Sequence, residues 1–399
     1  MKYAPITERL ANLGGAKWEV YNHARILKNQ GHDIIDLTIG EPDVPAPANL
    51  IEATIQSLNA GRTRYSNGRG EDNLRNALAQ KYTARCGRAI SPAQFLCLPG
   101  TQTALYVAMM GLVSDGDEVL VGDPMYATYE GVIAATGARA VPVPLRAENG
   151  FRLAADDIAA RITAKTRVIF LNTPHNPTGS ILTANDIDAI GALARKHDLW
   201  ILSDEVYEDL IFDNATFQSP LDRDDLQDRV ISVSSISKSH AAPGFRSGWC
   251  VGPANFVDRV LPVAETMLFG NQPFLADATA QVLSRPSEVA IGMRQRFAQR
   301  ANTVQRRLDG SFGMHVQKPD AGMFLLLNIA SLTPDDSEFA MDLLTKTGVA
   351  VMPGTSFGQG LQGWIRMALT VEDTLMDTAC DRLLAHAALV KPETSAAYV

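Results

Sequence analysis

The sequence predicts an α/β fold with a large domain, built on a mostly parallel seven-stranded sheet, and a smaller α/β C-terminal domain. From about residue 91 to residue 252, short apolar runs alternate with segments of helical periodicity. Three of the apolar runs lead directly into unusual polar sequences. The length of 399 residues is long for one domain and comfortable for two.

Seven short apolar runs are the expected strands of the large sheet. They are Phe95–Leu98, Glu118–Val121, Ala138–Pro142, Thr166–Leu171, Leu199–Ser203, Arg229–Val233 and Gly248–Val251. Helical patterns lie between several of them, at Thr101–Leu112, Tyr126–Thr136 and Thr183–His197. Strands that alternate with helices predict a largely parallel sheet with helices on both faces.

The C-terminal part reads as a second domain. An amphipathic helix is expected at Glu288–Leu308, followed by the strand Gly322–Ile329, the helix Asp336–Thr347, and the strands Ala350–Met352 and Trp364–Leu369. Ile39–Asp43 reads as a loop, and we expect the first 45 residues to pack with this domain or on a partner subunit. The expected division is an N-terminal arm with part of the small domain (1–45), a large domain (46–286) and a small domain (287–399).

Composition excludes several classes of protein. Charged residues at 20% and hydrophobic residues at 46% describe an ordinary globular chain, and the net charge of −8 argues against a nucleic-acid partner. The start of the chain lacks the apolar core of a signal peptide, and no apolar run reaches the roughly 18 residues of a membrane span, so we expect a cytoplasmic protein without a membrane partner. The four cysteines are scattered without metal-ligand spacing, so no metal site is expected.

Three expected strands end in polar sequences. Thr166–Leu171 leads into Asn172–Gly179, Leu199–Ser203 into Asp204–Tyr207, and Arg229–Val233 into Ser234–Arg246. In open sheets of this kind, ligands bind in the crevice at the carboxyl ends of the strands. The three polar segments are therefore expected to meet in one crevice.

The chemistry begins with Lys238, which follows an apolar strand and lies between serines. Burial or a cationic neighbour lowers the pKa of a lysine and makes its amine nucleophilic. Such an amine can form a Schiff base with pyridoxal 5'-phosphate, and a carboxylate such as Asp204 can keep the pyridine nitrogen of that cofactor protonated. A solvated surface lysine and a simple turn-capping aspartate are the alternatives.

The same cofactor needs groups for its phosphate and its ring. Phosphate donors are expected from Ser235, Ser237, Arg246 and the loop Gly100, Thr101 and Gln102, which follows a strand and opens a helix. Tyr207 and Asn176 are candidates to donate to the phenolic oxygen of the ring, and Tyr126 to stack on it. Core packing is the alternative for Tyr126.

Arg366 interrupts an apolar strand near the C-terminus. A buried arginine needs an anionic partner, and the α-carboxylate of an amino-acid substrate is a natural one. A structural ion pair is the alternative.

Along the chain these motifs follow the order Gly40, Tyr65, Gly100–Gln102, Tyr126, Asn176, Asp204, Tyr207, Lys238, Arg246 and Arg366. In this order they resemble the class I/II aminotransferases of the aspartate aminotransferase fold, the fold type I of pyridoxal-phosphate-dependent transferases. The resemblance covers nearly the whole chain. It implies a homodimer with active sites at the subunit interface. It also implies that Tyr65 reaches the phosphate in the neighbouring subunit and that Gly40 contacts substrate near its carboxylate.

Two departures from that family bear on the substrate. Ser247 stands where the family usually has an apolar residue, and Gln102 stands where the bacterial aspartate/prephenate subgroup carries a lysine. The second departure argues against a dicarboxylic substrate. Met125–Glu130, Pro142–Phe151 and Ser237–Ala241 look like bacterial arginine–pyruvate transaminases.

An N-terminal pair is the expected site for the substrate's side chain. Trp18 and Glu19 belong to a segment that often lines the substrate pocket in this family, and Glu19 is hypothesised to pair with a cationic side chain. A solvated helix residue is the alternative for Glu19.

The reaction that follows from the resemblance is a ping-pong transamination. The amino group of an L-amino acid, possibly arginine or another non-acidic donor, passes to a 2-oxo acid such as pyruvate through the Lys238 Schiff base, with Lys238 moving the proton and Asp204 and Tyr207 assisting. The alternatives are an aspartate transaminase and a C–S lyase on the same fold. A ligand-sensing regulator and an inactive relative are disfavoured, the latter because no expected cofactor contact is missing.

Overall fold

The computed structural model describes residues 2–11, 13, 16–212 and 215–390. All seven expected strands of the large sheet form: β2 (Phe95–Leu98), β3 (Glu118–Asp123), β4 (Arg139–Pro144), β5 (Thr166–Asn172), β6 (Trp200–Asp204), β7 (Val230–Ser235) and β8 (Gly248–Val251). Their order in the sheet is β2-β8-β7-β6-β5-β3-β4. The sheet is mostly parallel, as predicted, because only β8 runs antiparallel to its neighbours β7 and β2.

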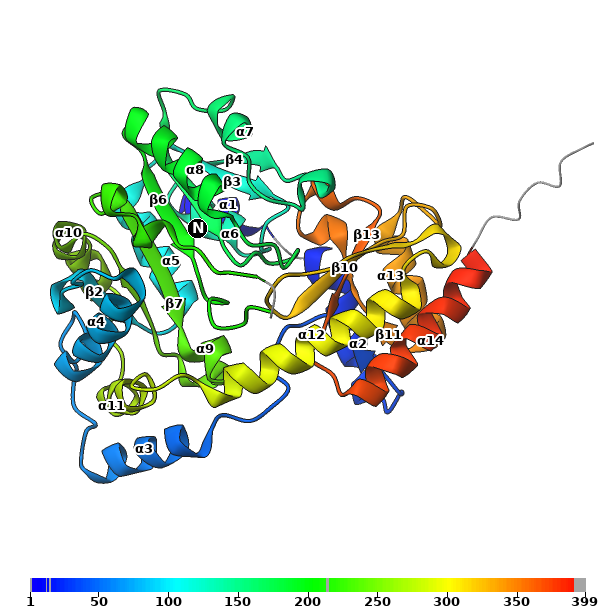
Figure 1. The fold of residues 1–399 in the computed structure, drawn as a ribbon, viewed down its shortest axis with the longest axis horizontal. Coiled ribbons are helices and arrows are strands. Elements are labelled where there is room, and N and C mark those ends of the chain that lie inside the picture. Colours follow the sequence, from blue (N-terminus) through cyan, green and yellow to red (C-terminus); the bar gives the residue numbers. More distant parts are fainter. Residues whose placement is uncertain (1, 12, 14–15, 213–214, 391–399) are drawn as a thin grey trace, which may run out of the picture.

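Helices cover both faces of this sheet (Figure 1). The helices of this part of the chain are α3 (Ala48–Asn59), α4 (Asp72–Cys86), α5 (Thr101–Leu112), α6 (Tyr129–Ala135), α7 (Ala155–Ala159), α8 (Ala184–Lys196), α9 (Ile236–Ser239), α10 (Ala254–Glu265) and α11 (Pro273–Val282), of which α3 packs on α11 rather than on the sheet. The alternation of side chains along each strand divides the core. Phe95 and Cys97 of β2 belong to one cluster with α4 and α8, whereas Leu96 and Leu98 belong to another with α5 and α10.

A second, four-stranded antiparallel sheet lies in the C-terminal part, in the order β12-β13-β10-β9. Its strands are β9 (His315–Gln317), β10 (Phe324–Asn328), β12 (Met352–Pro353) and β13 (Trp364–Ala368), and its helices are α12 (Glu288–Leu308), α13 (Asp336–Thr347) and α14 (Asp373–Val390). In Figure 1, α12 runs from the large sheet's side of the molecule to this second lobe. The first residues of α12 are tied back by Ser287, whose hydroxyl donates to the carbonyl of Ser239 at 2.6 Å.

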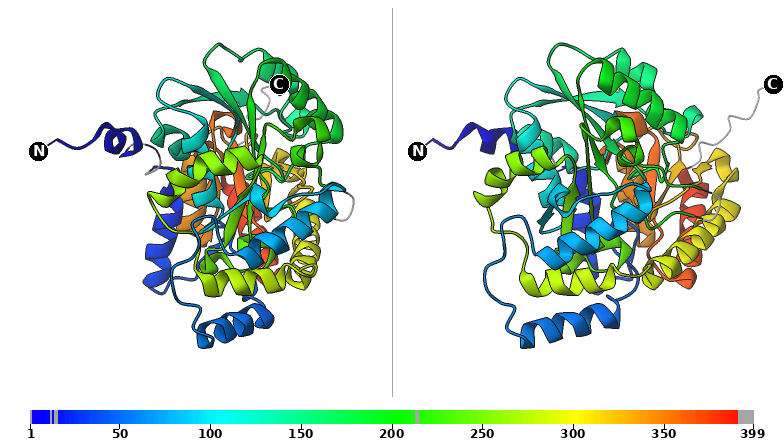
Figure 2. Two further views of the ribbon diagram at one scale, coloured as in Figure 1. Left: turned by 90° about the vertical axis from the view of Figure 1, so that its left-hand side faces the viewer. Right: turned by 60° about the vertical axis from the view of Figure 1, so that its left-hand side comes forward.

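The N-terminal segment joins the smaller lobe. β1 (Ile35–Asp36) pairs in parallel with β11 (Val349–Ala350). Val20 and Ala24 of α2 (Glu19–Asn29) belong to the same buried cluster as α12, α13 and α14. Helix α1 (Pro5–Ala11) projects from the body (Figure 2), and Arg9 Nε donates to the carbonyl of Ala134 at 3.1 Å. The division at residues 45 and 286 stays a prediction.

Two expected elements differ in the structure. Ala350–Met352 is not one strand, because Val349 and Ala350 pair with β1 while Met352 and Pro353 pair with β13. The helix expected at Tyr126–Thr136 begins only at Tyr129. The backbone N–H of Met125 donates across the fold to the carbonyl of Phe357 at 2.8 Å, which holds the preceding residues in a turn.

Candidate active site

The polar strand ends meet, as the sequence predicts, at the carboxyl ends of β5, β6 and β7. In the register of the sheet, Asn172 stands beside Asp204, and Ser203 stands beside Ser232 of β7. A cavity of about 240 Å³ opens there, with Phe324 and Arg366 of the second sheet on its other side. The expected site residues that line it are Trp18, Gly40, Thr101, Gln102, Tyr126, Asn176, Asp204, Tyr207, Ser235, Ser237, Lys238, Arg246 and Arg366.

Lys238 presents a buried amine to this cavity. It lies on α9, the single turn of helix that follows β7, and its Nζ donates to the carbonyl of Gly40 at 2.7 Å. Burial lowers the pKa of Lys238 to about 8, while the charge of Glu41 acts in the opposite direction. Neutral amine is therefore available near physiological pH.

Asp204 is the last residue of β6 and is buried. One carboxylate oxygen accepts from the backbone N–H of Val206 at 3.1 Å and the other from the hydroxyl of Tyr129 at 2.7 Å. Burial raises the pKa of Asp204 to about 6, and both hydrogen bonds oppose that rise. Tyr129 also lines the cavity and is absent from the residues inferred from sequence, because its contact with Asp204 spans 75 positions.

One end of the cavity is built to receive an anion. The N-terminus of α5 opens at Gly100, Thr101 Oγ1 donates to Ser235 Oγ at 2.9 Å, and Arg246 Nη2 donates to the carbonyl of Pro99 at 3.1 Å. Gly100 has a φ of +86°, and a Cβ there would lie 2.3 Å from Arg246 Nη2. A helix N-terminus beside two hydroxyls and a guanidinium is a donor set suited to a phosphate.

Arg246 holds a backbone conformation that few arginines adopt. Its φ of 50° and ψ of 51° lie in the left-handed region. Strained positions of this kind cluster at binding sites, where the surrounding structure fixes them.

Arg366 is buried on β13, between the rings of Phe324 and Phe357, at 3.9 and 4.3 Å from their centroids. Its Nη1 donates to Asn176 Oδ1 at 3.0 Å, and its Nη2 donates to the carbonyl of Thr38. Nε is buried without a partner within the described chain.

Burial lowers the pKa of Arg366 to about 10. None of the ion pairs found between described residues involves Arg366, so the alternative of a structural ion pair finds no support among them. A buried guanidinium with neutral partners is instead suited to bind an external carboxylate.

Asn176 and Tyr207 form one network with Arg366. The backbone N–H of Asn176 donates to Asn172 Oδ1 at 2.8 Å, which fixes the turn that carries it. Asn176 is also hydrogen-bonded to the phenol of Tyr207, whose pKa burial raises above its ordinary value, so that Tyr207 stays a proton donor. Tyr126 lines the cavity, with its ring edge-to-face against Tyr129 at 5.5 Å.

Three expected residues are outside the lining of the cavity. Gly100 is the residue that precedes α5, next to Thr101, which does line the cavity. Glu19 is exposed at the start of α2, although its neighbour Trp18 does line the cavity. Tyr65 is 93% exposed in the single chain, edge-to-face with the exposed ring of Phe269. The roles of these residues stay predictions.

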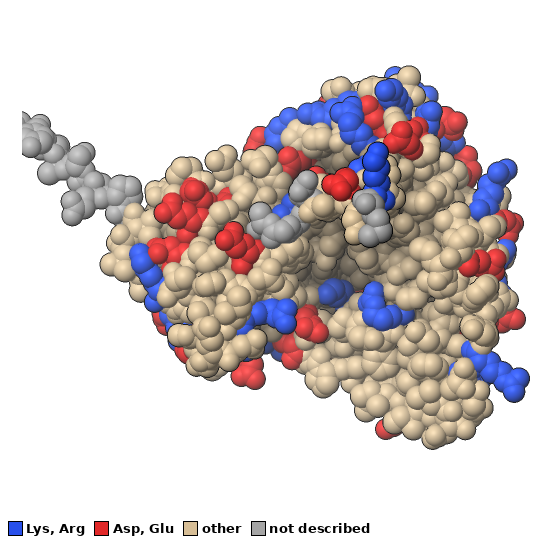
Figure 3. Space-filling model, turned by 180° about the vertical axis from the view of Figure 1, so that it is seen from behind, with Lys and Arg blue, Asp and Glu red and all other residues tan. Residues whose placement is uncertain are grey.

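Other kinds of site find no support among the described residues. They contain no group of three or more histidine, cysteine, aspartate and glutamate side chains able to hold a metal ion. Within the same ranges, no helix is long and apolar enough to cross a membrane. On the face shown in Figure 3, acidic and basic side chains lie interspersed along the upper rim and the left side, without a large area of one charge sign.

Residues 32–383 match the family described as aminotransferase class I and II. The chain belongs to the class I and II aminotransferases. This aminotransferase is 40% identical to the arginine–pyruvate transaminase AruH of Pseudomonas aeruginosa, over 97% of this chain and 98% of that protein. It is 31% identical to the aspartate/prephenate aminotransferase of Cereibacter sphaeroides, over 92% of this chain and 95% of that one.

Solved structures agree with the fold. The aspartate aminotransferase of Thermus thermophilus, as a double mutant, superimposes with a TM-score of 0.90 at 27% identity, covering 97% of this chain and all of that one. The aminotransferase from Thermotoga maritima, an aspartate aminotransferase, gives 0.89 at 28% identity, over 94% and 98% of the two chains. The fold class, the family and the enzyme class inferred from the sequence are therefore confirmed: the chain is a transaminase of the aspartate aminotransferase fold.

Proposed function

We propose that this transaminase uses pyridoxal 5'-phosphate to move the amino group of a non-acidic L-amino acid, such as arginine, to a 2-oxo acid such as pyruvate. The observation that supports it best is the arrangement of the cavity. A buried amine of lowered pKa and a buried carboxylate line the same cavity as an anion-binding helix N-terminus. Each of these groups fits one part of that cofactor.

Each part of the cofactor has a candidate partner. The helix N-terminus with Ser235, Ser237 and Arg246 would hold the phosphate, and Asp204 would pair with the protonated ring nitrogen. Tyr207 and Asn176 would donate to the phenolic oxygen, Tyr126 would cover a ring face, and Lys238 would hold the aldehyde carbon. The bound cofactor supplies an electron sink for the bond broken at the substrate's α-carbon.

The chain's own residues handle the substrate and its proton. Arg366 would bind the α-carboxylate and thereby orient the bond to be broken. Near pH 8 about half of the Lys238 amines are neutral. Once the substrate's amino group has displaced it from the aldehyde carbon, Lys238 would take the proton from the α-carbon and pass it to that former aldehyde carbon, and would move a proton in the opposite direction in the second half-reaction. Because the amino group is carried between two substrates in turn, we expect ping-pong kinetics.

The donor is inferred from two observations. A relative 40% identical over nearly the whole chain is named an arginine–pyruvate transaminase. Gln102, a neutral residue, lines the cavity. The family resemblance implies a lysine at this position in the bacterial aspartate/prephenate subgroup. Glu19 stays a candidate for recognition of a cationic side chain, although it is exposed in this structure.

A donor screen tests the proposal. Purified protein with pyridoxal phosphate is offered arginine, alanine and aspartate, with pyruvate or 2-oxoglutarate as acceptor. We expect arginine with pyruvate to be preferred, and Lys238→Ala to lose both turnover and the yellow absorbance of the lysine-bound cofactor. Preference for aspartate, or wild-type protein that binds no cofactor, contradicts the proposal. A shifted donor preference in Glu19→Gln would assign that residue a role.

The same assay separates transamination from elimination. A C–S lyase releases pyruvate from a β-substituted donor without any acceptor, whereas a transaminase needs the 2-oxo acid in every second half-reaction. We expect no sustained pyruvate release when the acceptor is left out.

A further inference from the structure

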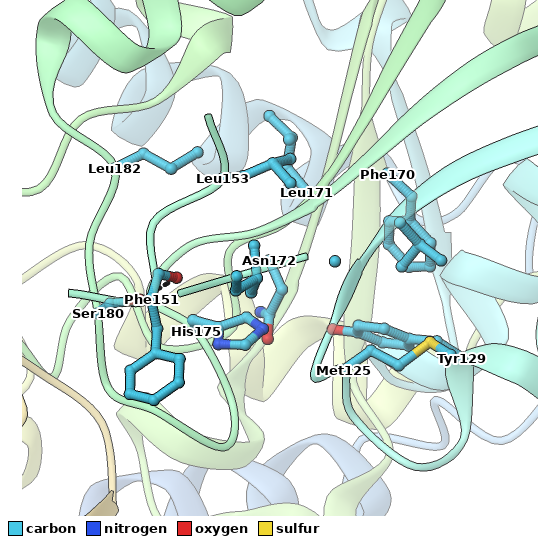
Figure 4. A pocket seen from close by; sticks show the side chains of 13 residues that line it. Met125, Tyr129, Phe151, Leu153, Phe170, Leu171, Asn172, His175, Ser180 and Leu182 are labelled. Carbon is cyan, nitrogen blue, oxygen red and sulfur yellow. Dashed lines mark hydrogen bonds between the residues drawn. The ribbon is translucent and has the colours of Figure 1, made fainter. Parts of the chain in front are cut away.

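Tyr129 is a buried polar residue at the site to which the proposed mechanism gives no role. It is the first residue of α6, and its side chain is only 2% exposed. It lines both the main cavity and a second cavity of about 30 Å³. Figure 4 shows its ring beside this second cavity, with the hydroxyl end directed toward Asn172 and His175. The side chain of Tyr129 is therefore part of the wall of both cavities.

The hydroxyl of Tyr129 makes one of the two bonds that fix the carboxylate of Asp204. It donates to Oδ2 at 2.7 Å, while the backbone N–H of Val206 donates to Oδ1 at 3.1 Å. A carboxylate with a donor on each oxygen cannot rotate about its last bond without breaking one of them. Each oxygen can still accept a further hydrogen bond from a group in the cavity.

The ring of Tyr129 is itself held in place. It packs on Phe170 of β5, with centroids 4.4 Å apart, and the ring of Tyr126 stands edge-on to it at 5.5 Å. Such aromatic pairs each stabilise a fixed orientation beyond the area they bury. The phenol is thus a rigid donor, which costs little reorganisation when a ligand enters.

Among the described residues, the titratable groups whose pKa the charge of Asp204 raises are three phenols. Tyr126, Tyr129 and Tyr207 each interact electrostatically with its charge. Its neighbours in the sheet, Asn172 on β5 and Val233 on β7, are neutral. With no cation among these neighbours, the carboxylate depends on hydrogen bonds to stay ionised.

The pKa values agree with that dependence. Burial raises the pKa of Asp204 to about 6, and the bond from Tyr129 is the largest influence in the opposite direction. Burial and the charge of Asp204 raise the pKa of Tyr129 well above its ordinary value, so the phenol keeps its proton. The proton of this bond therefore stays on Tyr129, and Asp204 stays the acceptor.

We infer that Tyr129 is a positioning residue, which holds Asp204 ionised and aimed into the cavity near neutral pH. The inference rests on the proposed function, in which Asp204 pairs with the protonated ring nitrogen of pyridoxal phosphate. It makes a quantitative prediction about cofactor affinity, because that pairing is lost once Asp204 takes up a proton. The pH at which affinity falls on the acid side reports the pKa of Asp204.

Tyr129→Phe removes the donor and keeps the ring. The dissociation constant of pyridoxal phosphate is measured from pH 5 to pH 8 for cofactor-free wild type and variant. The acid-side midpoint is the pH at which the fall in cofactor affinity on the acid side is half complete. We expect this midpoint to rise by about one pH unit, a tenfold change in the proton affinity of Asp204. We also expect kcat to fall at pH 7 and to recover in part at higher pH, with little change in the KM of the donor.

Tyr82→Phe is the matched control. Tyr82 is also a fully buried tyrosine, and its hydroxyl accepts from Trp249 Nε1 at 2.8 Å rather than bonding to Asp204. It should lose a similar amount of thermal stability while leaving the acid-side midpoint at the wild-type pH. If the Tyr129→Phe midpoint matches that of this control, the inference is overturned and Tyr129 is only a packing residue.

A second variant decides the question even if Tyr129→Phe does not fold. Incorporation of 3-fluorotyrosine at position 129 keeps the ring and hydroxyl but makes the phenol a stronger donor. The acid-side midpoint should then move down, opposite to the change in Tyr129→Phe, and an unmoved midpoint would count against the inference. Failure of the wild type to bind pyridoxal phosphate overturns the proposed function itself, whereas an unmoved midpoint overturns only the role of Tyr129.

Discussion

The amine of Lys238 shows how one residue acquires its chemistry from its surroundings. An exposed lysine is almost wholly protonated at neutral pH, but burial penalises the charged form and lowers this pKa to about 8. The cationic neighbours Arg366 and Arg246 act in the same direction, and Glu41 acts against them. Its reactivity is therefore a property of the folded cavity.

A labelling experiment checks this pKa. Cofactor-free protein is treated with an amine-directed reagent at a series of pH values, and modification of Lys238 is read by mass spectrometry. Because only the neutral amine reacts, labelling should rise with pH through a midpoint near 8. Glu41→Gln removes a charge that raises the pKa, so its midpoint should lie lower. A midpoint near 10.5 would contradict the burial argument.

Arg366→Lys tests recognition of the carboxylate. A lysine keeps the positive charge but loses the planar fork that is stacked between Phe324 and Phe357. We expect kcat/KM for the amino donor to fall about 30-fold, equivalent to about 2 kcal/mol. The affinity for pyridoxal phosphate should change little, which separates this role from cofactor binding. Equal losses for cofactor and donor would indicate a structural role instead.

At the scale of elements, the turn between β2 and α5 has to approach Arg246 closely. Gly100 permits this because it has a positive φ and no side chain. Gly100→Ala would place a methyl group 2.3 Å from Arg246 Nη2, so we expect weaker binding of pyridoxal phosphate. Gly116→Ala is the control, because Gly116 has the same φ of +86° with nothing within 4 Å. The control should lose comparable stability and keep its cofactor affinity.

A buried ionic network joins α4 to the loop that follows β6. Arg85 Nη1 lies 2.5 Å from Glu208 and 3.2 Å from Glu205, and Lys81 Nζ lies 3.0 Å from Glu208. Asp204, at the end of β6, precedes Glu205 directly, and Tyr207 lies in this loop, so the network supports two residues of the site. Without Arg85, Glu208 would keep Lys81, but Glu205 would lose its cationic partner, and burial already raises the pKa of Glu205 to about 7.

Arg85→Met should therefore lower the free energy of unfolding by about 3–5 kcal/mol, the usual effect of leaving a buried charge unpaired. Arg195→Met provides the comparison. Both arginines lie in the last turn of a helix, but Arg195 pairs with Asp225 at the surface. We expect a change below about 1 kcal/mol there. Denaturant unfolding measures both, and equal effects would show that the network adds nothing.

At the scale of the whole molecule, the homodimer that the family resemblance implies makes a prediction about Tyr65. This aromatic is 93% exposed in the single chain and lies outside its own cavity. If it serves the neighbouring subunit, a mixed dimer of Lys238→Ala and Tyr65→Ala chains contains one site with both defects and one with neither. Mixing the two variants after partial unfolding should restore activity above that of either alone. Light scattering should show twice the mass of one chain.

The sequence by itself determined the alternation of strands and helices and the order of the motifs. Apolar runs of four to seven residues with polar ends are local patterns, which is why β2 and β8 form at their expected bounds. The sequence also points to Asp204 and Lys238, because Asp204 directly follows one expected apolar strand and Lys238 lies five residues after another.

Tertiary structure alone decided the contacts between distant segments. Tyr129 meets Asp204 across 75 positions, Arg366 meets Asn176 across 190, and Lys238 meets Gly40 across 198. Periodicity and propensity describe neighbours along the chain, whereas these partners are chosen by how the sheet and its helices pack. The pKa values of the site follow from that packing, because the site residues are buried only where the two lobes pack together around the cavity.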